Sequence, residues 1–145
     1  MTVRVARQLP ASRARVWAEL REIERHVEWM ADAVAITFTS SQREGVGTTF
    51  RCLTRVGPLS LVDVMTITSW REQEALGVRH EGLVTGEGDF ALRDDDAGTL
   101  VSWTETLHFP WWLGGHVGEL IARPVFGSLW RGNLRRLAER VDDST

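Results

Sequence analysis

Residues 34–109 contain β-favouring residues in six runs, with short polar connections between them. The runs cover residues 34–39, 48–56, 59–70, 76–83, 87–92 and 99–109. In the second run, for example, Phe50 and Cys52 alternate with Arg51 and Leu53, the pattern of a strand with two different faces. Gly57-Pro58 and the acidic segment 94–98 are turn signals. Because no helical pattern intervenes, the sequence predicts an antiparallel meander.

The flanking segments complete the predicted element order. Residues 2–9 read as a strand, and Ser12 is a good N-cap for a helix whose Val16, Trp17 and Leu20 recur at helical spacing. A second short helix is expected over residues 23–29, and residues 115–141 have helical spacing throughout. The prediction is an α+β fold of order β-α-α-β-β-β-β-β-β-α, in a single domain spanning residues 1–145.

Composition narrows the function classes. The net charge of −3 argues against a nucleic-acid binder, since neutralising phosphates requires a clustered positive surface. The sequence shows no secretory signal and no apolar run long enough to cross a membrane, and Cys52 has no second cysteine to pair with. We therefore expect a cytoplasmic protein. Its histidines and cysteine lack metal-ligand spacing, so we expect no metal and no cofactor.

Several short segments, taken in order, resemble a known superfamily over nearly the whole chain. They are Leu9-Pro10-Ala11-Ser12 followed by Val16-Trp17, Gly45-Val46-Gly47-Thr48, Gly98-Thr99-Leu100-Val101-Ser102-Trp103, and Asn133-Leu134-Arg135-Arg136-Leu137. In these features the sequence resembles the START-like superfamily, also called SRPBCC, which includes polyketide cyclase/dehydrase and lipid-transport proteins. The resemblance implies a helix-grip fold, in which a curved antiparallel sheet wraps around a long C-terminal helix. It does not specify the ligand, because one fold hosts many functions.

Strand parity predicts which side chains face the helix and line a cavity. In the last strand Val101, Trp103 and Leu107 share a face with Glu105, so the apolar face carries a carboxylate inward. The ligand-binding residues expected on this basis, with those of the helix and its approach, are Phe50, Cys52, Met65, Ile67, Val78, His80, Phe90, Val101, Trp103, Glu105, Leu107, Phe109, Trp112, Val117, Leu120 and Ile121.

Glu105 and His80 are the candidate polar groups of such a cavity. A buried carboxylate is costly unless it is paired, hydrogen-bonded or protonated. Glu105 therefore either has a partner, such as an inward histidine or a tryptophan N–H, or serves a ligand as an anchor or an acid–base group. The direction of Asp63 is undecided, because both faces of its strand are apolar, and Asp89 should point outward.

The C-terminal helix contains two apolar stripes that point in different directions. Val117, Leu120 and Ile121 belong to the first stripe, and the second begins at Phe126. Pro124 lies between them, so we expect a kink or break near it. The preceding Trp111-Trp112 pair, beside two glycines, is compatible with core packing, with a gate, or with contact to a membrane interface.

The leading functional interpretation is binding of a hydrophobic small molecule, such as a lipid, an isoprenoid or a polyketide-like compound. The family resemblance also permits a polyketide aromatase/cyclase-type enzyme, with Glu105 and His80 as catalytic acid–base groups. A third alternative is a protein-interaction module. The expected partner is the small molecule, with transient membrane contact possible through Trp111 and Trp112, and the chain is either a monomer or a homodimer.

Overall fold

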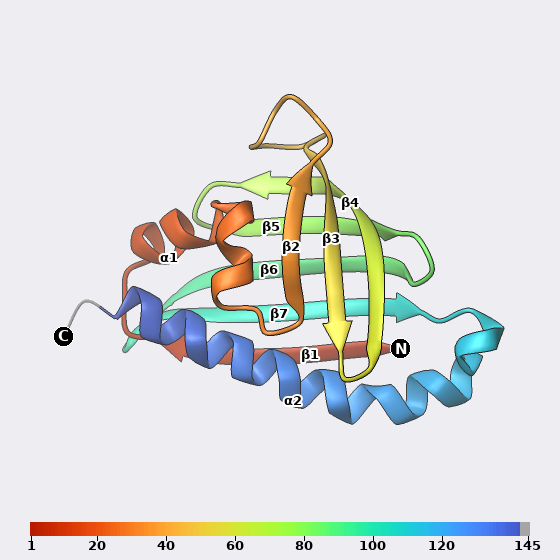
Figure 1. Ribbon diagram of the computed structural model, residues 1–145. Helices are drawn as coiled ribbons and strands as arrows, with labels where there is room; N and C mark the ends of the chain where they lie inside the picture. The colour runs from red at the N-terminus through yellow and green to blue at the C-terminus, as the bar shows by residue number, and fades with distance from the viewer. Residues whose placement is uncertain (143–145) are drawn as a thin grey trace.

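A computed structural model describes residues 1–142, and in it seven strands form one antiparallel sheet curved around a long helix (Figure 1). The strands are joined in the order β1-β7-β6-β5-β4-β3-β2. Their bounds are β1 Thr2–Leu9, β2 Ala33–Phe38, β3 Thr49–Val56, β4 Leu59–Arg71, β5 Ala75–Glu81, β6 Thr85–Asp95 and β7 Gly98–His108. The predicted meander is confirmed, and β1 closes it by pairing with β7.

Two short helical segments connect β1 to β2 across one end of the sheet. The helix α1 spans Arg13–Leu20, and the Ser12 side chain caps it by accepting a hydrogen bond from the Arg15 backbone N–H at 3.2 Å. The next segment, η1 at Ile23–Glu28, is a 3-10 helix. Both predicted helices are therefore present, the second one in a tighter form.

The C-terminal helix α2 runs over Gly115–Val141 without interruption, preceded by the short 3-10 helix η2 at Trp111–Leu113. Of the expected kink or break near Pro124, the break is absent, because Pro124 lies inside α2. The axis of the helix nevertheless bends along its N-terminal half (Figure 1). A proline inside a helix removes one backbone hydrogen bond and bends the helix at that place.

The two apolar stripes of α2 have different environments. Trp130, Leu134 and Leu137 of the second stripe are buried against the sheet. Leu120 and Ile121 of the first stripe are about 70% exposed, because this stripe points away from the side of the helix that packs on the sheet. A single helix thus accommodates both stripes by burying only one of them.

Polar contacts hold α2 in place at both ends. The buried Glu119 carboxylate accepts a hydrogen bond from the Phe109 backbone N–H at 3.1 Å and lies 3.7 Å from the ammonium group of Met1. Toward the other end, Arg140 donates to the buried Glu19 of α1 at 2.8 Å. These contacts fix the helix across the open side of the sheet.

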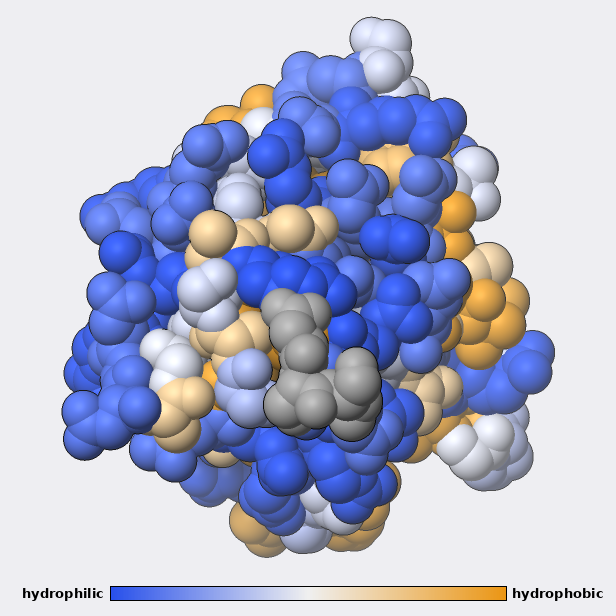
Figure 2. All heavy atoms as spheres, turned by 90° about the vertical axis from the view of Figure 1, so that its left-hand side faces the viewer, coloured by the Kyte–Doolittle hydropathy of each residue, from blue (hydrophilic) through white to orange (hydrophobic). Residues whose placement is uncertain are grey.

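The interior at the α1 end is solid. Val16, Leu20, Val101, Leu134 and Leu137 are fully buried there and leave the helix and sheet in contact. The outer surface of this end is mainly hydrophilic (Figure 2). Within residues 1–142, no helix is long and apolar enough to cross a membrane.

Candidate functional site

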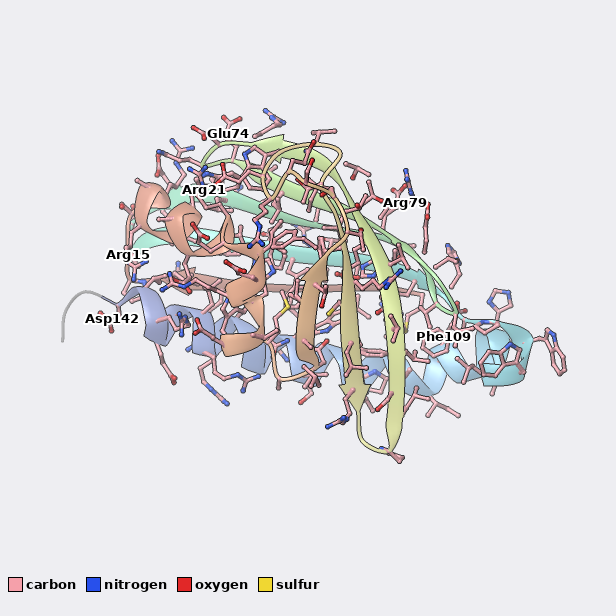
Figure 3. The ribbon with its side chains drawn as sticks, turned by 45° about the horizontal axis from the view of Figure 1, so that its top comes forward. Arg15, Arg21, Glu74, Arg79, Phe109 and Asp142 are labelled. Atoms are coloured by element: carbon pink, nitrogen blue, oxygen red, sulfur yellow. The ribbon has the colours of Figure 1, made fainter. Side chains whose placement is uncertain are left out.

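A cavity of about 230 Å³ lies between the concave face of the sheet, η1 and α2. Its walls are mostly apolar, with Trp103 of β7, Ile67 of β4 and Trp130 of α2 among them. Figure 3 labels Phe109, a wall residue at the junction between β7 and α2, and Arg79, which projects from the outer side of β5. The space left between sheet and helix is therefore at the end of the fold away from α1.

Most of the side chains expected on the inner face do line this cavity. They are Phe50, Cys52, Met65, Ile67, Val78, His80, Phe90, Trp103, Glu105, Leu107 and Phe109. Strand parity identified them, because each strand presents every second side chain to the concave face. Their position on the wall is a structural fact, and their contact with a ligand remains a prediction.

Five other expected residues do not line the cavity. Val101 faces inward but lies in the solid part of the core, where α2 fills the space. Trp112, Val117, Leu120 and Ile121 are exposed on η2 and the first half of α2. The alternative that Trp111 and Trp112 pack in the core is also wrong, since these side chains are 86% and 52% exposed.

The structure adds wall residues that were not among the expected ligand-binding residues. The polar ones are His26 and Asp32 from the η1 region, Thr54 of β3 and Asp63 of β4, and two aromatic ones, Phe126 and Trp130, come from α2. The last two belong to the second helical stripe, so the stripe itself was the signal for them. Asp32 is held by α2, because Asn133 donates to it at 2.8 Å.

Glu105 and His80 meet across a strand that has no side chain between them. Glu105 is on β7 and His80 is on β5, and the intervening strand β6 has Gly86 and Gly88 opposite them. A β-carbon on Gly88 would lie 2.5 Å from Glu105 Oε1, so the carboxylate occupies the space that this glycine leaves free. His80 Nε2 is consequently 2.9 Å from Glu105 Oε2.

The surroundings of the pair favour a charged histidine. Trp103 Nε1–H donates to Glu105 Oε1 at 3.1 Å, which satisfies the second carboxylate oxygen. His80 Nε2, at 2.9 Å from the other oxygen, forms an ion pair with the carboxylate when the ring is protonated. Burial alone would lower the pKa of His80, but the adjacent Glu105 carboxylate and, more weakly, Asp63 outweigh burial and raise it.

Asp63, whose direction the sequence left undecided, points into the cavity. It is 8% exposed, and its Oδ2 accepts a hydrogen bond from Thr54 Oγ1 at 3.0 Å. Burial raises the pKa of Asp63, against the opposing effect of His80. By contrast, Asp89 of β6 is exposed on the outer face, as expected.

Neither the thiol nor the polar wall groups form a metal site. Burial raises the pKa of the Cys52 thiol to about 11, so it is a protonated wall group at neutral pH. Among residues 1–142, no group of three or more His, Cys, Asp or Glu side chains is arranged to hold a metal ion.

Residues 1–142 match the protein family described as polyketide cyclase / dehydrase and lipid transport. The chain belongs to this family. The match covers every strand and helix described above, including the three strands that carry Asp63, His80 and Glu105. No curated protein sequence matches the chain significantly.

Solved structures similar to the chain share this family's fold at low sequence identity. Protein TTHA0849 from Thermus thermophilus is 19% identical with a TM-score of 0.81, and 97% of each chain is covered. Protein MLL2253 from Mesorhizobium loti is 16% identical with a TM-score of 0.75, covering 100% of this chain and 99% of that one. The di-domain ARO/CYC StfQ from the steffimycin biosynthetic pathway is 10% identical with a TM-score of 0.77, covering 95% of this chain and 49% of that one. At these identities the likeness establishes the helix-grip fold alone.

Proposed function

We propose that this protein binds a hydrophobic small molecule, such as a lipid, an isoprenoid or a polyketide-like compound, in the cavity between the sheet and α2. The observation that carries the proposal is a mostly apolar cavity of about 230 Å³ between the sheet and α2. Removing apolar surface from water contributes roughly 25 cal/mol per Å² of favourable free energy. Pockets that bind small molecules combine such walls with a few placed polar groups.

The cavity adjoins a surface groove through which a ligand could pass. The groove lies between the β3–β4 turn and α2, with Gly57 on one side and Pro124 and Val125 on the other. Val56 belongs to both the groove and the cavity wall. We place the ligand's access route here, where the bend of α2 meets the end of the β3–β4 hairpin.

Extraction of the purified protein with organic solvent, followed by mass spectrometry, tests the binding function. We expect an apolar molecule to be recovered from the wild-type protein and lost from a Val78→Phe variant, whose larger side chain fills the cavity. The matched control is Val64→Phe, because Val64 is exposed on the neighbouring strand. Equal recovery from all three proteins would assign the molecule to the surface and contradict the proposal.

A second candidate function, acid–base catalysis of a polyketide cyclase kind, is favoured by the His80–Glu105 pair. In an aldol closure the Glu105 carboxylate would accept a proton from the carbon next to one ligand carbonyl, and that carbon would attack the carbon of a second carbonyl of the same ligand. A protonated His80 would donate a proton to the oxygen of the second carbonyl, which becomes a hydroxyl. Turnover of a poly-carbonyl surrogate that is lost in both Glu105→Gln and His80→Gln supports catalysis. Binding of the surrogate without turnover leaves the protein a carrier.

We also propose that the exposed face of η2 and α2 contacts a membrane transiently. Trp111, Leu120 and Ile121 are its most exposed apolar side chains. The exposed charged or ionisable groups of residues 111–125 are His116 and Arg123, both basic, in a chain of net charge −3. Tryptophan is enriched at membrane interfaces, and basic groups are attracted to anionic lipids. The alternative partner of this face is a second copy of the chain. Analytical sedimentation of the protein without lipid distinguishes the two, because a second copy would make the protein sediment as a dimer.

A further inference from the structure

Asp63 is a nearly buried side chain on the cavity wall, and one of its two carboxylate oxygens has no hydrogen-bond donor. Only Oδ2 of its carboxylate has a hydrogen-bond donor, the Thr54 hydroxyl at 3.0 Å. Oδ1 is fully buried and accepts no hydrogen bond from any of residues 1–142. A buried acceptor without a donor destabilises the fold, and more so when it is charged. The cavity therefore contains a polar position that the protein itself does not satisfy.

The other carboxylates on the cavity wall differ from Asp63 in this respect. Glu105 has Trp103 on one oxygen and His80 beside the other. Asp32 accepts from Asn133 at 2.8 Å on one oxygen and from Trp130 Nε1–H at 3.4 Å on the other. Asp63 is therefore the wall carboxylate with an oxygen left for a ligand.

The charges around the cavity favour a particular kind of polar group there. The wall carries the carboxylates of Asp32, Asp63 and Glu105 and the imidazoles of His26 and His80. Burial lowers the pKa of His26 to about 4, so this ring is neutral at neutral pH and does not offset the negative charge, whereas the pKa of His80 is raised. A ligand carboxylate placed at Asp63 would meet like charge and bring no donor. A hydroxyl or amine would satisfy Oδ1, and an amine would also reduce the excess of negative charge.

We propose that Asp63 is the polar anchor of the site and that its Oδ1 accepts a hydrogen bond from the ligand. The ligand class is then an apolar molecule whose polar end carries a hydroxyl or amine donor, and molecules ending in a carboxylate are excluded. This inference rests on the proposed binding function and specifies its ligand. It assigns to Asp63 the anchoring role that the sequence alone had suggested for Glu105.

The test is isothermal titration calorimetry of the wild-type protein at neutral pH with three naphthalene derivatives. They are 2-naphthol, its methyl ether and 2-naphthoate, which share one ring system and carry respectively a donor, no donor and a carboxylate. We expect 2-naphthol to bind at least about tenfold more tightly than the methyl ether, as a hydrogen bond to a charged group allows. The carboxylate should bind most weakly.

Asp63→Asn provides the second arm, because the amide oxygen can keep the Thr54 bond while the amide N–H₂ replaces Oδ1. In this variant the advantage of 2-naphthol over its methyl ether should disappear, and 2-naphthoate should bind better than it does to the wild type. Asp89→Asn, the same substitution on the outer face, should leave the wild-type order unchanged.

The outcomes separate this inference from the binding function. Equal affinity of the wild type for 2-naphthol and its methyl ether would overturn the role of Asp63 and leave the apolar binding function standing. Binding of none of the three would overturn both. If Asp63→Asn does not fold, the wild-type comparison of alcohol and ether still decides.

Discussion

The carboxylate of Glu105 lies directly over Gly88, the residue that pairs with it on the neighbouring strand. This relationship explains how a glutamate can be buried among aromatic side chains. Because Gly88 has no side chain, the carboxylate crosses β6 and reaches His80 on β5, 2.9 Å away. The polar part of the cavity wall thus depends on a glycine as much as on the two ionisable residues.

Gly88→Ala should separate Glu105 from His80. The new methyl group would lie 2.5 Å from Oε1, and the flexible end of Glu105 would have to move rather than the backbone. We expect the pKa of His80 to fall, because the carboxylate that raises it moves away. An NMR titration of the His80 ring measures this. The control is Gly132→Ala, a glycine replacement on α2, which should leave the His80 titration curve as in the wild type. If Gly88→Ala also titrates like the wild type, the proposed geometry of the pair is contradicted.

His26 should make the fold sensitive to mild acid. Burial lowers its pKa from 6.5 to about 4, although its hydrogen bond with the Leu20 carbonyl at 2.7 Å opposes the shift. Folding therefore favours the neutral ring, so its contribution is present above about pH 6.5 and is lost as the pH falls toward 4. The loss in free energy of unfolding is roughly 3 kcal/mol.

Urea unfolding measured across this pH range tests the effect of His26. His26→Gln keeps a nitrogen donor for Leu20 but does not titrate, so its stability should change less between neutral pH and mild acid. Parallel pH profiles for the wild type and the variant would show that other groups cause the acid sensitivity.

Removing apolar surface from the first half of α2 should weaken binding to anionic vesicles. In a Leu120→Ser/Ile121→Ser double variant, two side chains about 70% exposed lose their apolar atoms, and fold stability should hardly change. Cosedimentation with phosphatidylserine vesicles gives the measurement. Val62→Ser/Val64→Ser, on the outer face of the sheet, removes exposed apolar surface elsewhere. An equal loss in both double variants would indicate non-specific adsorption.

Filling the cavity should abolish ligand binding without unfolding the protein. Val78→Phe adds a ring to the wall beside His80, whereas Val64→Phe adds the same ring to an exposed position on β4. Titration with the neutral fluorescent probe N-phenyl-1-naphthylamine should give enhancement with the wild type and Val64→Phe and little with Val78→Phe. Enhancement by all three would place the probe on the surface.

The sequence predicted those parts of the site that follow from local periodicity. The inner face of β7, with Trp103 and Glu105 together, follows from alternation alone and is confirmed by their burial. The partner of Glu105 does not follow, because its pairing with His80 depends on strand order and on Gly88 between them. Asp63 remained undecided because Val62 and Val64 make the outer face of β4 apolar too.

The helix shows where periodicity misleads. The stripe of Leu120 and Ile121 looked like a buried surface, yet the structure leaves it exposed, since sequence spacing does not reveal whether a neighbouring element covers a face. Likewise, Val101 has the correct orientation for the cavity, but the depth of packing under α1 and α2 determines that no space remains beside it.

The space between the sheet and α2 is the proposed binding site for a hydrophobic molecule. A crystal structure of the protein grown with N-phenyl-1-naphthylamine tests it most directly. We expect electron density for the probe inside the cavity, in contact with Trp103, Val78 and Met65. Density confined to the exposed face of η2 and α2, or side chains that close the cavity around no ligand at saturating probe, would contradict it.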